Sequence, residues 1–128
     1  MKMKLARLID SGFQNSVRTL MKQPLPLKAA YKLRGVVKKA EAELTQYEEM
    51  RKEALQKYGK KKEDGTLDTT ETNNVQFETQ ETLQVFLKDI GDLTNVDVDM
   101  PAITLTELGD DIRLSTEDLM NLEGLIVD

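Results

Sequence analysis

The sequence predicts a mainly α-helical protein built around a long helical hairpin. Short helices precede the hairpin, and a C-terminal arm of short β-strands plus a short helix follows it. Apolar residues recur at three- and four-residue steps over most of the chain, and they switch to a period of two after residue 95. We expect a single domain over residues 1–128, with an N-terminal helical segment at 1–24, the hairpin at 25–93 and an acidic arm at 94–128.

The N-terminal segment, residues 3–22, is predicted to be helical with one break. Asp10 is a capping residue type and Gly12 lowers helix propensity, so the break is expected near Ser11. Gln23 to Pro26 contains two prolines, which favour extended geometry in the residues before them and permit a helix to begin directly afterwards.

A long helix is predicted from Leu27 to about Tyr58. Its apolar positions follow alternating steps of three and four, which is a 3.5-residue repeat typical of the seam of a left-handed helix pair. An ordinary amphipathic helix with slight drift is the alternative. Arg51 interrupts the seam, so it is expected to reach an acidic group, pack through its stem or lie at a wet edge. The seam comprises Ala30, Leu33, Val37, Ala40, Leu44, Tyr47, Arg51, Ala54 and Tyr58.

Gly59 and the surrounding lysines are expected to end this helix. Residues 60–74 are polar and are predicted to form a loop with a turn at Asp64-Gly65. A second helix, from about Val75 to Leu93, carries Phe77 and Phe86 on its apolar side and is expected to pair with the long helix.

The arm alternates between apolar and polar residues. Three short strands are predicted, around Val96 to Met100, at Ile103 to Leu105 and at Ile112 to Leu114. Ser115 to Asp118 resembles a capping box and predicts a short helix. This helix is expected to carry Leu119, Met120, Leu122, Leu125 and Ile126.

The composition argues against most chemistry. The chain has no Cys and no His, which excludes disulfides, zinc sites of the usual ligands and nucleophiles activated by histidine. Asp97 and Asp99 would share one face of a strand and so invite a magnesium or manganese hypothesis, but a solvated strand face is the preferred interpretation. We therefore expect no enzyme activity, no cofactor and no small-molecule substrate. The absence of a long apolar run predicts a soluble, unprocessed chain.

Charge is divided unequally along the chain. Residues 1–62 carry 16 Lys/Arg and 6 Asp/Glu, a net of +10, whereas residues 63–128 carry 2 and 17, a net of −15. Three interpretations are open. The halves pair within one chain, the basic end of one copy meets the acidic end of the next, or one end faces an external polyelectrolyte.

A basic stripe on the long helix raises the last possibility. Lys28, Lys32 and Lys39 lie at helical spacing, but aromatic residues are sparse, with Tyr31 the nearest. Nucleic-acid binding is therefore not the preferred interpretation, and the lysines are expected to solubilise the helix or contact acidic protein.

Several stretches resemble small proteins of unknown function encoded by tailed bacteriophages and prophages. They are Leu25 to Leu33, Tyr47 to Arg51 through Tyr58-Gly59, the turn at Asp64-Gly65, and Ile103 to Leu105 with Ile112 to Leu119 and Leu122-Glu123. The resemblance covers about residues 20–126 and brings no catalytic residues. It implies a phage context, in a virion or in the host cytoplasm.

The predicted function is thus that of a non-enzymatic phage structural or assembly accessory, an oligomer or a partner of a larger viral structural protein. The alternative is an inhibitor of a host defence or nucleic-acid enzyme, with the acidic half imitating nucleic acid. No membrane contact is expected. The residues predicted to make protein contacts are Leu33, Val37, Leu44, Tyr47, Arg51, Val96, Val98, Met100, Leu119 and Leu122.

Overall fold

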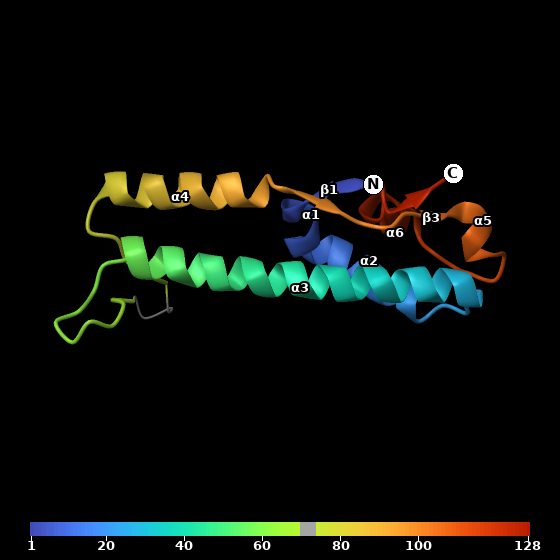
Figure 1. The fold of residues 1–128 in the computed structure, drawn as a ribbon, viewed down its shortest axis with the longest axis horizontal. Coiled ribbons are helices and arrows are strands. Elements are labelled where there is room, and N and C mark those ends of the chain that lie inside the picture. The colour runs from blue at the N-terminus through green and yellow to red at the C-terminus, as the bar shows by residue number, and fades with distance from the viewer. Residues whose placement is uncertain (70–73) are drawn as a thin grey trace. The chain divides into compact units, whose positions relative to one another are not determined.

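The computed structural model describes residues 1–69 and 74–128, and it is mainly helical, as predicted (Figure 1). The chain divides into two compact units. Met1–Leu44 and Asn95–Asp128 form the first, and Thr45–Thr94 form the second. The longest helix, α3 (Leu27–Tyr58), contributes to both units and has the bounds predicted from the sequence. The division therefore falls inside the segment expected to be one hairpin.

In the first unit, α1 (Leu5–Ile9) and α2 (Ser11–Met21) are separated at Asp10. Asp10 is extended, and its carboxylate accepts a hydrogen bond from the Phe13 backbone N–H at 3.0 Å. This N-cap satisfies a backbone donor that the new helix would leave free, so the predicted break is confirmed. The strand β1 (Lys2–Lys4), which precedes α1, was not predicted.

The arm contributes two small sheets. β2 (Asp97–Asp99) pairs antiparallel with β1, and β3 (Ile103–Thr104) pairs parallel with β4 (Ile126–Val127). α6 (Thr116–Asn121) begins at Ser115 with the predicted capping box.

Three predictions for the arm are wrong. Leu105 does not continue a strand but begins α5 (Leu105–Leu108), because Thr104 and Glu107 form a capping box. No strand is present at Ile112 to Leu114. Leu125 and Ile126 lie beyond α6, because the chain turns at Gly124, whose φ of +88° is in the region that favours glycine.

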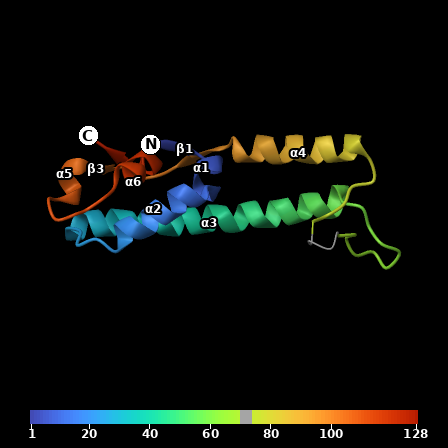
Figure 2. The ribbon, with the colours of Figure 1, turned by 180° about the vertical axis from the view of Figure 1, so that it is seen from behind.

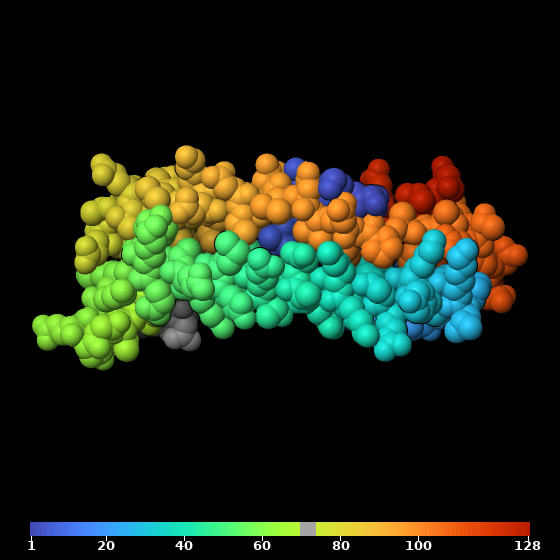
Figure 3. All heavy atoms as spheres, in the orientation of Figure 1, coloured from blue at the N-terminus to red at the C-terminus, as the bar shows by residue number. Residues whose placement is uncertain are grey.

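The core of the first unit is assembled from segments distant in sequence. It joins both N-terminal helices, the first half of α3 and the arm. In the space-filling view, the arm (orange) adjoins the first half of α3 (cyan) (Figure 3). The most deeply buried large side chains are Leu8, Leu20, Val36, Met100, Ile103, Leu108, Leu122 and Leu125.

The second unit contains the hairpin. α4 (Gln80–Thr94) lies alongside residues 45–58 of α3 in both ribbon views (Figures 1 and 2). Tyr58 donates a hydrogen bond to Asp89 at 2.8 Å, and the Phe77 and Phe86 ring centroids are 5.2 Å apart. The hairpin prediction is confirmed, but α4 starts later than the predicted Val75.

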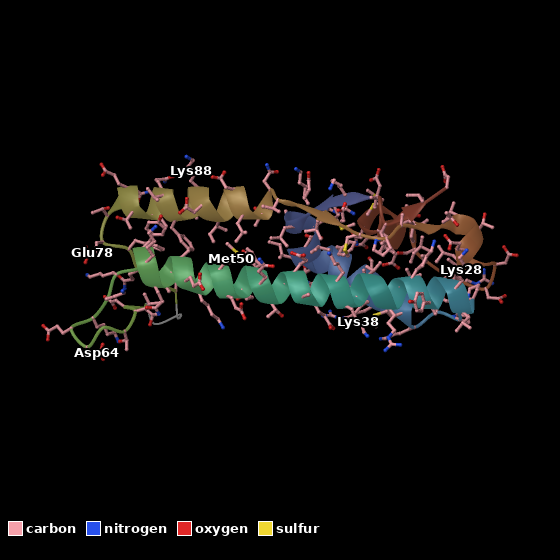
Figure 4. The ribbon with its side chains drawn as sticks, viewed as in Figure 1. Lys28, Lys38, Met50, Asp64, Glu78 and Lys88 are labelled. Atoms are coloured by element: carbon pink, nitrogen blue, oxygen red, sulfur yellow. The ribbon has the colours of Figure 1, made fainter. Side chains whose placement is uncertain are left out.

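The late start of α4 has a local cause. The Gln76 backbone N–H donates to the Asp68 carbonyl, and its own carbonyl accepts from the Lys60 N–H at 2.7 Å. These bonds hold the chain around residue 76 in an extended ladder. The predicted turn contains Gly65 at a φ of +86°, and Asp64 lies at the loop tip (Figure 4). Residues 70–73 of the predicted loop lie outside the described residues.

Candidate protein-binding groove

The first unit carries an apolar groove between α2 and α3. One part, of about 550 Å³, is lined by the end of α2, the proline-containing connection and α3. A second part, of about 250 Å³, lies between α2 and the following turns of α3. Met21 and Val37 line both parts, so we treat them as one surface, the α2–α3 groove. α2 passes in front of α3 in Figure 2.

Helix periodicity explains why the groove exists. Ala29, Leu33 and Val36 point into the core of the first unit and are buried. At about 100° per residue, Ala30 and Val37 lie on the adjacent flank of α3. α2 has only 11 residues and covers this flank incompletely, so apolar side chains of α3 remain accessible along its edge.

The predicted seam supplies the α3 side of this groove. Ala30, Leu33 and Val37 line the larger part, and Val37, Ala40 and Leu44 line the smaller one. The seam positions between Ala30 and Leu44 thus lie along this groove. Met21, at the end of α2, and the hinge residues Pro24 and Leu25 form the opposite wall. Sequence reasoning missed the hinge residues, because an apolar hinge is not periodic.

The rim of the groove is mainly basic. Among the described residues that line it, Arg18, Arg34 and Lys38 are cationic and Glu41 is anionic. Lys38 lies on the side of α3 that faces away from the arm (Figure 4). Arg18 donates to the Asn15 side chain at 3.0 Å, which is a local contact within α2. The groove therefore combines apolar walls with positive potential at its edge.

The remaining predicted contact residues are distributed differently. Val98, Met100 and Leu122 are buried in the core of the first unit, and Leu33, although it borders the groove, is only 3% exposed. Val98, Met100 and Leu122 are therefore inaccessible to a partner, because their own chain already covers them. The strand around Val98 was expected to offer a free edge, but β1 pairs with it.

The other predicted contact residues remain at least partly accessible. Val37, Leu44, Tyr47 and Arg51 are half-buried, and Val96 and Leu119 are exposed. Arg51 reaches an acid, which is one of the three arrangements expected for it, with its guanidinium 3.8 Å from the Glu48 carboxylate.

Asp97 and Asp99 do share one face of a strand, as predicted, but lysines of β1 neutralise them. The Lys4–Asp97 distance is 2.9 Å and the Lys2–Asp99 distance is 3.1 Å. Lys2 holds the pKa of Asp99 below its usual value, mainly through a hydrogen bond. The described residues contain no group of three or more potential metal-ligating side chains.

A third contact joins the basic and acidic halves in a more protected setting. The Lys32 ammonium lies 2.7 Å from one Glu107 oxygen and 2.9 Å from the other. Together with hydrogen bonds from Thr104, Lys32 lowers the pKa of Glu107 to about 2. Some basic residues of the first half of the sequence therefore pair with acidic residues of the second half within one chain. Lys32 belongs to such a pair rather than to a free basic stripe.

A polar cluster fixes α6 on α2. The buried Ser16 hydroxyl donates to Asp118 at 2.8 Å and accepts from the Asn121 amide at 3.1 Å. The Ser16 hydrogen bond is the main reason that the pKa of Asp118 is lowered. Arg7 donates to the Asn121 and Glu123 carbonyls at 2.9 and 2.8 Å. These contacts are structural, and they determine which side of α6 faces outward.

Comparison of the sequence and structure with known proteins gives no match among protein-family models, curated proteins or solved structures. The helices within the described part of the chain include none long and apolar enough to cross a membrane.

Proposed function

We propose that this chain is a non-enzymatic structural or assembly accessory of a tailed-phage particle and acts by binding other protein chains. The α2–α3 groove is the observation that carries the proposal. The phage context is part of the proposal and rests only on the resemblance of residues 20–126 to small phage-encoded proteins.

The walls of the groove support a protein as its ligand. They consist mainly of aliphatic, methionine and proline side chains, contributed by Met21, Pro24, Leu25, Leu33, Val37 and Leu44. Grooves of this composition between helices accept apolar side chains of an amphipathic segment, and they bind through buried apolar area. Met21 is 52% exposed at the junction of the two parts of the groove. Burial of a methionine side chain is favourable, so covering Met21 with a partner would contribute to binding.

The polar groups of the groove fit the same ligand. Gln14, Gln23, Arg18, Arg34, Lys38 and Glu41 lie among its lining residues. This set contains no Ser, Thr or Tyr hydroxyl beside a basic group, and no carboxylate pair. It therefore supports recognition of a charged surface more than it supports a reaction.

Mass spectrometry of purified particles tests the proposal. We expect the chain to be present in a fixed copy number, as ring or shell symmetry requires. Met21→Asp places a charge in the groove and is expected to remove the chain from particles. Met50→Asp makes the same substitution on α3 at a 42% exposed position outside the groove lining and is expected to leave incorporation unchanged.

Two outcomes would overturn the proposal. One is a chain absent from particles that instead binds a host protein in a salt-sensitive manner, which favours an inhibitor whose acidic half imitates nucleic acid. The other is equal incorporation of Met21→Asp and the wild-type chain when both are folded by circular dichroism, because the groove would then have no role.

A further inference from the structure

The groove and the outer surface of α6 are complementary, and they lie on opposite sides of α2. We propose that the α2–α3 groove of one copy receives α6 of a second copy, so that copies join head to tail. This inference rests on the proposed function, because it names the partner of the same groove.

The groove sets the chemistry of its occupant. Its apolar walls require apolar side chains, and Arg18, Arg34 and Lys38 on the rim favour carboxylates beside them. A suitable surface therefore presents at least one large apolar residue flanked by acids, with no Lys or Arg among the adjoining residues of the same element.

The outer surface of α6 meets these requirements. Met120 is 69% exposed and Leu119 is 45% exposed, and the exposed residues Glu117 and Glu123 flank them. α6 itself contains no Lys or Arg, and the Arg7 side chain that reaches its end is bonded to the Asn121 and Glu123 carbonyls. The first unit fixes this orientation, because α6 directs Asp118 and Asn121 toward α2 and thereby turns Leu119 and Met120 outward.

The outer side of α4 is a weaker candidate. It exposes Val85 and Leu87, at 45% and 51%, but Lys88 follows Leu87 directly. A lysine there would oppose the basic rim of the groove, so the acidic surface of α6 is the better match.

The positions along α2 show why the contact joins different copies. Ser16 bonds α6, and a side chain at Gly12 would lie 3.3 Å from Asn121, so this side of α2 faces α6. Val17, Arg18 and Met21 line the groove. At about 100° per residue, the two sets lie on roughly opposite sides of the helix. A chain therefore cannot place its own α6 in its own groove.

A contact between two different surfaces has a defined consequence. Each copy that fills a neighbour's groove leaves its own groove open, so addition continues until a ring closes or a filament forms. In this arrangement the basic rim of one copy faces the acidic α6 of the next. The unequal charge along the sequence thereby fixes the direction in which copies add.

Light scattering coupled to size-exclusion chromatography tests the inference on the full chain. We expect the wild-type mass to rise with concentration and to fall back at high salt. Met21→Asp blocks the groove and Met120→Asp blocks α6, so each variant alone is expected to be monomeric, with association weakened about tenfold or more. Met50→Asp is the matched control and is expected to associate like the wild type.

Mixing the two blocked variants gives the decisive result. Met120→Asp keeps an intact groove and Met21→Asp keeps an intact α6, so one productive contact remains between them. We expect a 1:1 dimer that grows no further at any ratio. A mixture that stays monomeric would overturn the inference, and so would a Met120→Asp variant that associates like the wild type.

The same variants separate this inference from the proposed function. If the chain is monomeric at all concentrations, but Met21→Asp is lost from particles while Met120→Asp is retained, then the groove binds a different protein. The inference of self-association then fails and the proposed function stands. If the wild-type chain is instead absent from particles but associates in solution, the proposed function fails and the inference of self-association stands.

Discussion

Leu122 and Leu119 lie three residues apart, one at the end of α6 and one within it, and truncating each to alanine tests the packing of the arm. Leu122 is completely buried and Leu119 is 45% exposed. Both were predicted to contact a partner, but the structure assigns Leu122 to the core. The two substitutions remove the same three carbon atoms. The difference between their losses of unfolding free energy therefore reports only how the two side chains are surrounded.

The expected magnitudes follow from burial. Removing three buried carbons costs roughly 2.4 kcal/mol at about 0.8 kcal/mol each. The cavity left at a fully buried site raises the loss to about 3 to 4 kcal/mol for Leu122→Ala. Leu119 is about half in water and leaves no closed cavity, so Leu119→Ala is expected to cost about 1 kcal/mol or less.

Urea unfolding followed by circular dichroism measures both losses. A loss of this size for Leu122→Ala corresponds to a fall in Tm of roughly 10 °C for a chain of this length. Equal losses for the two variants would refute the placement of Leu122, because a residue free to contact a partner does not leave a cavity when it is truncated.

Three further predictions concern the acidic and small residues. Glu107 has a folded pKa of about 2 against an ordinary 4.5. The stability that it contributes is therefore present above pH 4.5 and is lost as the pH falls toward 2. Acid unfolding of Glu107→Gln is expected to show a flatter dependence of stability on pH in this window. Gly59→Ala places a Cβ 2.6 Å from a carbonyl oxygen and is expected to destabilise the second unit. Gly91→Ala adds a Cβ to α4 that meets nothing within 4 Å, so it is expected to raise stability by up to about 1 kcal/mol. Thermal melts in which the two variants do not shift Tm in opposite directions would contradict this. Ser16→Ala removes the main hydrogen bond to Asp118 and is expected to raise the pKa of that carboxyl toward its ordinary value, as read by NMR titration.

The sequence by itself determined the elements whose causes are local. The 3.5-residue repeat and the flanking proline and glycine residues set the bounds of α3, and capping residues set the starts of α2 and α6. Each of these signals acts within a few residues, so it can be read without knowing the fold. The same repeat placed Val37 and Leu44 on one seam, and both line the groove.

Only the tertiary structure decided which apolar residues are covered by their own chain. β1 and β2 are separated by more than 90 residues, and each is too short to be recognised alone. Their pairing buries Val98, which sequence reasoning had assigned to a partner. The wall of the groove at Met21 and Leu25 also depends on where α2 ends beside α3. Whether a residue is buried depends on which distant segments of the chain pack against it, and no local sequence pattern specifies those segments.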